Sequence, residues 1–148
     1  MPGQTERPTL DYAIVCDDVR FERDDKISLM GLFDAIKLQS LPTVHPRLAV
    51  VAAWMGVHGV VKSEIQLVDP SGNLLRQLGV ASLEQKGFRK GARHIAVALN
   101  VPFKTSGIYQ IQFYLDGGLV RSIHLPVESV GTPQTGFGRM GGKLSDLA

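Results

Sequence analysis

Acidic side chains are densest between residues 17 and 25, which raises the question of a cation site. A hard cation such as Ca²⁺ needs several oxygen ligands that converge on one point. The spacing of the acids does not match an EF-hand loop, and basic residues alternate with them. We therefore interpret the segment as solvated strand ends around a hairpin turn, not as a metal site. Its acids are Asp17, Asp18, Glu22, Asp24 and Asp25, and its bases are Arg20, Arg23 and Lys26.

The residue types that carry out hydrolysis or bind transition metals are present but form no motif. No serine stands in a G-x-S-x-G sequence. Cys16, the one cysteine, lies on the apolar side of a predicted strand, where a thiol is usually an inert small hydrophobe. We predict a protein that is not an enzyme, with no catalytic residues, metal or cofactor. A hydrolytic or metal-dependent site assembled from distant strands is the alternative. The histidines lie far apart, without the close ligand pairs of zinc sites, at His45, His58, His94 and His124.

A basic loop follows the middle of the chain, with Lys86, Arg89, Lys90 and Arg93 within eight residues. Its two glycines would let backbone amides approach a phosphate, and Phe88 could stack on a base. Anion or nucleic-acid binding by this loop is therefore the second functional hypothesis. The alternative is a solvated connection whose charges discourage edge-to-edge pairing of strands.

The C-terminal residues from about 131 to 148 are rich in glycine and cannot bury much surface, so we expect a flexible tail. Phe137, Met140 and Leu144 are isolated apolar side chains within it. Their spacing suits anchors for a partner's groove or a neighbouring subunit's sheet edge. These three are the candidate partner-binding residues, and a plain disordered terminus is the alternative.

Apolar and polar residues alternate with a period of two through most of the chain, which predicts β-strands. Turn residues mark positions 24–26, 69–73 and 116–118, the last with an Asp-Gly pair typical of hairpins. Pro42 and Pro46 predict a loop between them, because neither can donate a ladder hydrogen bond. A bulge or bend is expected at Gly31 and Asp34, within the predicted strand 27–38. The predicted strands cover residues 10–16, 19–23, 27–38, 48–55, 61–68, 74–83, 95–103, 107–115 and 119–127.

Residues 48–55 are apolar on both faces, which favours a central strand buried on both sides over a short helix. Many strands without βαβ alternation predict the all-β class, and we expect a two-layer antiparallel β-sandwich. The length of 148 residues suits one domain. We place it at residues 10–130, between a flexible N-terminal arm at 1–9 and the Gly-rich tail at 131–148.

Two segments resemble known families. Residues Cys16 to Arg20, followed by Asp25 to Asp34, resemble the opening of a family of small, uncharacterised bacterial β-sandwich proteins. The segment from Gly107 to Val127 is similar to the final hairpin of many immunoglobulin-like sandwiches, although the inter-sheet cysteine pair is absent. The resemblance implies an immunoglobulin-like fold, and it brings no activity and no functional residues.

Charge and composition limit the partners and the cellular location that the sequence predicts. Sixteen basic against fourteen acidic residues leave +2, which argues against nucleic acid as a partner. The first residues lack the apolar stretch of a signal peptide, and the longest apolar run is too short to span a membrane. We expect a cytoplasmic bacterial protein without membrane contact. Its predicted function is non-catalytic binding or assembly through a sheet edge and the terminal arms, with another protein or with copies of itself.

Overall fold

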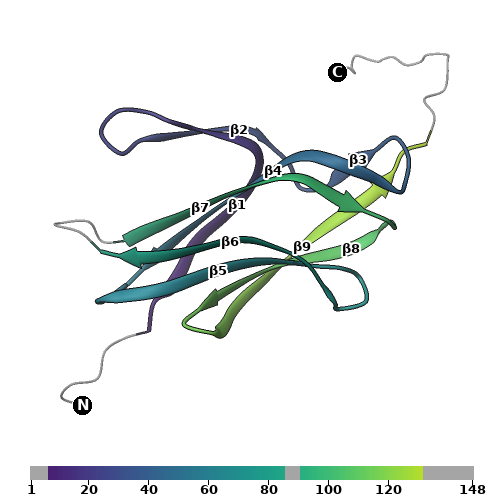
Figure 1. Cartoon of the computed structure of the whole chain (residues 1–148). Coiled ribbons are helices and arrows are strands. Elements are labelled where there is room, and N and C mark those ends of the chain that lie inside the picture. The colour runs from purple at the N-terminus through teal and green to yellow at the C-terminus, as the bar shows by residue number, and fades with distance from the viewer. Residues whose placement is uncertain (1–6, 86–90, 132–148) are drawn as a thin grey trace.

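The computed structural model describes residues 7–85 and 91–131, which form two β-sheets and no helix (Figure 1). The strand order is β2-β1-β4-β7 in the first sheet and β3-β9-β8-β5-β6 in the second. Neighbouring strands are antiparallel, except that β3 and β9 run parallel. No helix long and apolar enough to cross a membrane occurs in these two ranges. The strands are β1 (Thr9–Phe21), β2 (Ile27–Leu32), β3 (Ile36–Leu38), β4 (Thr43–Met55), β5 (Val60–Val68), β6 (Leu74–Glu84), β7 (Gly91–Phe103), β8 (Gly107–Leu115) and β9 (Gly118–Ser129).

One apolar core fills the space between the two sheets. Successive side chains of a strand point to opposite faces, so each strand contributes every second residue. From β4 these include Leu48 and Trp54, and from β8 they include Ile111 and Phe113, all fully buried. The alternation in the sequence therefore selects the inward faces, and the predicted all-β two-layer sandwich is confirmed.

The order of the strands is immunoglobulin-like. Strands β1, β4 and β7 take the places of A, B and E, and β9, β8 and β5 those of G, F and C. Near the start of β8 the Tyr109 hydroxyl donates a hydrogen bond of 2.7 Å to the carbonyl of Thr105, as in the tyrosine corner of that fold. Ile111 stands two residues later, where such domains carry the second cysteine of their disulfide. The core is thus immunoglobulin-like without the cross-link.

The three predicted turns are all present. Asp24 and Asp25 have φ of 59° and 61° at the tip of the β1–β2 hairpin, and Asp116 has φ of 46° between β8 and β9. These left-handed conformations suit Asp among the non-glycine residues. Between β5 and β6, Asp69 Oδ1 accepts the backbone N–H of Asn73 at 2.9 Å. The turn residues of the sequence therefore predict the positions of these three hairpins correctly.

Three predicted boundaries are wrong. Residues 27–38 form two strands, β2 in the first sheet and β3 in the second, not one. Residues 9–21 form one strand, not two, because β1 exchanges partners at Cys16: it pairs with β4 before this residue and with β2 after it. The loop predicted between Pro42 and Pro46 belongs largely to β4, which begins at Thr43. Proline is tolerated there because β1 has already left β4 at Ala49, so this part of β4 has no partner on that side.

Candidate functional site

After Cys16, β1 separates from β4, and the hairpin of β1 and β2 packs over the outer face of β4 (Figure 1). Residues 18–31 of this hairpin are called the flap. Ala49 and Val51 of β4 point away from the main core and are nevertheless fully buried, because the flap covers them. This second cluster explains why residues 48–55 are apolar on both faces, as predicted for a central strand. The cluster comprises Cys16, Val19, Ala49 and Val51, with Tyr12, Ile27, Leu29 and Ile95 packed against it.

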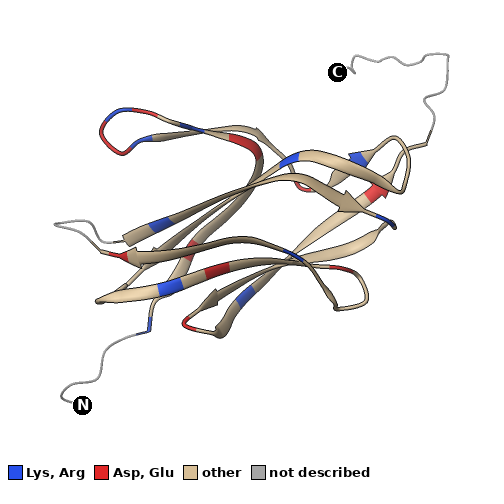
Figure 2. Ribbon diagram, in the orientation of Figure 1, with Lys and Arg blue, Asp and Glu red and all other residues tan. Residues whose placement is uncertain are grey.

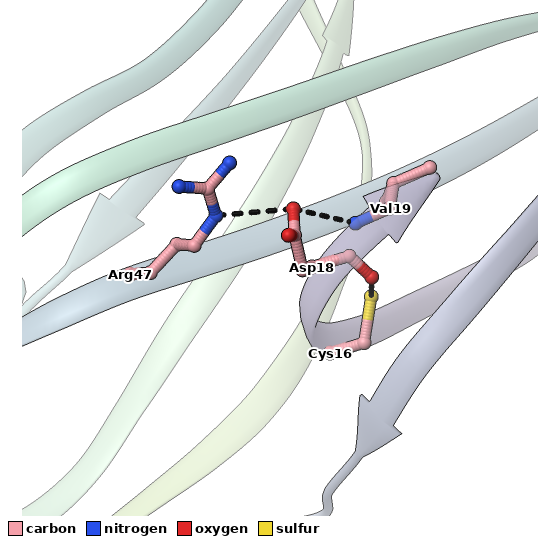
Figure 3. A network of polar contacts seen from close by, with 4 residues as sticks. All are labelled: Cys16, Asp18, Val19 and Arg47. Carbon is pink, nitrogen blue, oxygen red and sulfur yellow. Dashed lines mark hydrogen bonds and ion pairs between the residues drawn. The ribbon is translucent and has the colours of Figure 1, made fainter. Parts of the chain in front are cut away.

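The base of the flap is held by Asp18, where β1 bends (Figure 3). Its Oδ1 atom accepts the Nε–H of Arg47 from β4 at 3.0 Å and the backbone N–H of Val19 at 2.8 Å. The Cys16 thiol donates to the Asp18 carbonyl at 3.4 Å. Burial raises the pKa of the Cys16 thiol, which keeps it protonated, as expected for an inert small hydrophobe.

The tip of the flap carries charges of both signs (Figure 2). Arg93 of β7 donates from Nη2 to the backbone carbonyl of Asp25, which ties the tip to the first sheet. Glu22 accepts the hydroxyl of Ser28 at 2.8 Å. Across residues 7–85 and 91–131, no group of three or more His, Cys, Asp and Glu side chains is placed to hold a metal ion. The acidic residues of positions 17–25 instead lie in the β1–β2 hairpin, where Asp18 and Glu22 accept hydrogen bonds from neighbouring residues.

A hollow of about 260 Å³ lies at the root of the flap, lined by residues that include Asp17, Phe33, Lys37 and His45. The His45 ring packs edge-on against Phe33 and Phe103, with ring centroids 6.3 Å away in each case. Burial lowers the pKa of His45, and the Asp17 carboxylate opposes that effect. The imidazole is therefore neutral and packed between aromatic rings. The described residues that line the hollow include no serine and no cysteine.

A serine and a histidine do meet inside the sandwich. The Ser63 hydroxyl of β5 lies 2.7 Å from Nδ1 of His94 on β7, and the two side chains are 0% and 4% exposed. Burial lowers the pKa of His94. The hydroxyl cannot reach a substrate, so the pair is an internal link between the sheets. Sequence reasoning missed it, although a polar residue in the apolar row from Val61 to Leu67 was the signal.

Strands β6 and β7 close one side of the sandwich. Arg76 of β6 donates to the carbonyls of Leu99 at 2.7 Å and Asn100 at 3.2 Å, on β7. Gly79 of β6 permits the close approach, since a Cβ there would lie 2.7 Å from the Cβ of Ala96. The guanidinium covers edge carbonyls that would otherwise bind a foreign strand.

The opposite side, formed by β9, is blunted in a different way. Strand β3 covers only residues 127–129 of β9. The remaining edge has a register shift opposite Phe113 and Tyr114, a charged residue at Arg121 and a proline at Pro126. Bulges, charges and prolines are the usual devices that keep edge strands from pairing.

The β2 edge of the flap has none of these devices. Its register with β1 is continuous from Met30 to Ile27, and it contains no proline. The hydrogen bond from the N–H of Glu22 to the carbonyl of Lys26, 2.9 Å long, fixes which residues face β1. Hydrogen-bonded pairs alternate along an antiparallel ladder, so the backbone groups of Ile27 and Leu29 point away from β1. Met30 and Leu32 flank this edge, 41% and 61% exposed.

The sequence-predicted site residues fall almost entirely outside the described ranges. Lys86, Arg89 and Lys90 of the basic loop lie there, and so do the three apolar residues of the tail, Phe137, Met140 and Leu144. Arg93 is described, and its guanidinium is engaged by the flap tip. The flap itself was not predicted, because alternation shows which side chains are buried and not which surface buries them.

Residues 11–128 match the model of DUF6941, a family of unknown function. None of the curated proteins matches significantly. Among solved structures, an immunoglobulin-like protein from Pseudomonas aeruginosa shares 12% identity at a TM-score of 0.42, over 84% of this chain and 99% of its own. An alkylpurine DNA glycosylase from Pseudomonas fluorescens, solved bound to DNA with an abasic site analogue, shares 13% identity at a TM-score of 0.42 over 82% of this chain. This chain spans only 30% of the glycosylase, and likenesses this slight say nothing about activity.

Proposed function

Because the chain belongs to DUF6941, a family of unknown function, its role has to be argued from its geometry, and we propose that it is a non-catalytic protein-binding module. The β2 edge of the flap is its binding surface. An extended segment of a partner adds to this edge as a further strand. Main-chain hydrogen bonds then supply affinity and side chains beside the edge supply specificity.

One observation carries this proposal: β2 is regular from Ile27 to Met30, whereas the pairing of β6 with β5 has two register shifts and β9 has a register shift and a proline. The outward backbone groups of β2 belong to Ile27 and Leu29, and both side chains are seated in the cluster below the flap. The edge is thereby held rigid before binding, so little ordering entropy is lost when a partner strand arrives. The exposed Met30 and Leu32 side chains offer apolar contacts next to the ladder.

The other hypotheses gain less support. Lys86, Arg89 and Lys90 of the basic loop lie outside the described residues, and the guanidinium of Arg93 donates to a backbone carbonyl. Anion binding by this loop stays a prediction. We place the proposed binding activity in the cytoplasm, in keeping with a single buried thiol and no disulfide.

Site-specific photo-crosslinking tests the proposal. A photoreactive residue at Leu32 should form a protein adduct in the cell. One at Val80, 54% exposed on β6, should not, because the register of β6 with β5 shifts twice. Met30→Lys should abolish the adduct at position 32, because lysine on an edge opposes strand addition. Leu74→Lys, at another exposed position of β6, is the matched control and should leave it unchanged. Equal labelling at positions 32 and 80, or no adduct at either, would refute binding at β2.

A further inference from the structure

We infer that the strand added at the β2 edge is β2 of a second copy of this chain, paired antiparallel about a two-fold axis at Ser28. The inference rests on the proposed function and names its partner. It joins the two flaps into one continuous four-stranded ribbon. Ser28 lies midway between the two residues whose backbone groups point outward, Ile27 and Leu29.

Symmetry and the short regular part of β2 together select this register, because an axis at Ile27 or Leu29 would pair one outward residue with Asp25 or Gly31, both at positive φ. A two-fold axis normal to a sheet keeps side chains on their own face, so it must pass through a residue that opposes itself. With the axis at Ser28, Ile27 of each copy opposes Leu29 of the other. Both residues direct N–H and C=O outward, so each of these two pairs closes a pair of ladder hydrogen bonds. Every outward backbone group of the regular part of β2 is then satisfied.

Charge favours the same arrangement. Lys26 of one copy opposes Met30 of the other, and its apolar stem can lie along the exposed thioether. On β1, Asp18 is the ladder partner of Met30, so its carboxylate, which also accepts the Nε–H of Arg47, lies one strand beyond. Each Lys26 ammonium thus lies between two carboxylates: Glu22 of its own hairpin and Asp18 on β1 of the second copy. No like charges oppose each other directly, and the contact occurs twice by symmetry.

A cysteine at the axis gives a direct test in the full chain. Directly opposed residues of a non-hydrogen-bonded antiparallel pair have Cα atoms about 4.5 Å apart, within the range that a disulfide spans. Ser28→Cys should therefore oxidise to a species of twice the 16.1 kDa chain mass, reversed by reductant. Ser82→Cys on the exposed β6 edge is the control and should stay monomeric. Cys16 is buried and does not compete.

Lys26→Glu tests the charge argument without altering the core, because Lys26 is exposed. It places three acids together at both ends of the interface, and we expect the dissociation constant from sedimentation equilibrium to rise roughly tenfold. A Ser28→Cys chain that oxidises no faster than Ser82→Cys overturns the inference, and so does a Lys26→Glu chain that associates like the wild type. If position 32 then crosslinks to a different protein, the proposed function stands and only self-pairing fails; if it crosslinks to nothing, both fail.

Discussion

Replacing Gly79 by alanine tests how tightly β6 and β7 close their side of the sandwich. The new methyl carbon would lie 2.7 Å from Cβ of Ala96 and 3.0 Å from Nε2 of His94. Carbon atoms in contact normally lie about 3.5–4.0 Å apart, so β6 must move outward by roughly 1 Å. Overpacking of this kind costs about 1–3 kcal/mol, and the stiffer unfolded chain offsets about 0.4–1 kcal/mol. We expect a net loss of roughly 1–2 kcal/mol in the free energy of unfolding.

Urea denaturation followed by tryptophan fluorescence measures this loss, since Trp54 is the only tryptophan and is fully buried. Gly118→Ala is the matched control: its nearest new contact is 3.6 Å away, at the Leu115 carbonyl, and it should change stability little. Ala96→Gly combined with Gly79→Ala removes the carbon–carbon clash and should cost less than the sum of the single changes. A Gly79→Ala chain as stable as Gly118→Ala would refute the close packing of β6 on β7.

Two further predictions concern the same side of the sandwich. Arg76→Ala removes two hydrogen bonds at an exposed site, so the free energy of unfolding from urea denaturation should fall by about 1 kcal/mol. Light scattering should increase, because the β7 edge is uncovered. Unchanged scattering would contradict the protection of β7 by Arg76. Burial lowers the pKa of His94, so the unfolded state binds the proton first, and stability should fall as the pH drops below the ordinary histidine value of 6.5. Urea midpoints measured between about pH 7.5 and 5 check this. His94→Gln should make the decline shallower, and a decline as steep as that of the wild type would contradict the prediction.

The sequence predicts a feature well where one local rule decides it. Strict alternation and an Asp-Gly turn predict a strand at residues 107–115, and β8 runs over those residues. The two apolar faces of residues 48–55 likewise indicated burial on both sides. What covers the second face could not be predicted, since that depends on the bend of β1 at Cys16.

The candidate site shows the same division. Local chemistry predicts the turn at Asp24 and Asp25, but it indicates solvated strand ends on either side of the turn and not the flap that the structure has. The link between Ser63 and His94 joins residues 31 positions apart, a distance that only the fold brings together. A guarded edge such as β7 also depends on Arg76 from another strand, so no pattern within β7 reveals it.

Amide hydrogen exchange of β2 tests most directly whether its edge is the interface. In dilute solution the amides of Ile27 and Leu29, which point away from β1, should exchange quickly, while those of Ser28 and Met30 are protected by the β1 ladder. As the protein concentration rises, protection should appear at Ile27 and Leu29 and leave the β6 amides unchanged. Exchange at Ile27 and Leu29 that does not slow with concentration would contradict the pairing of β2 with a second copy.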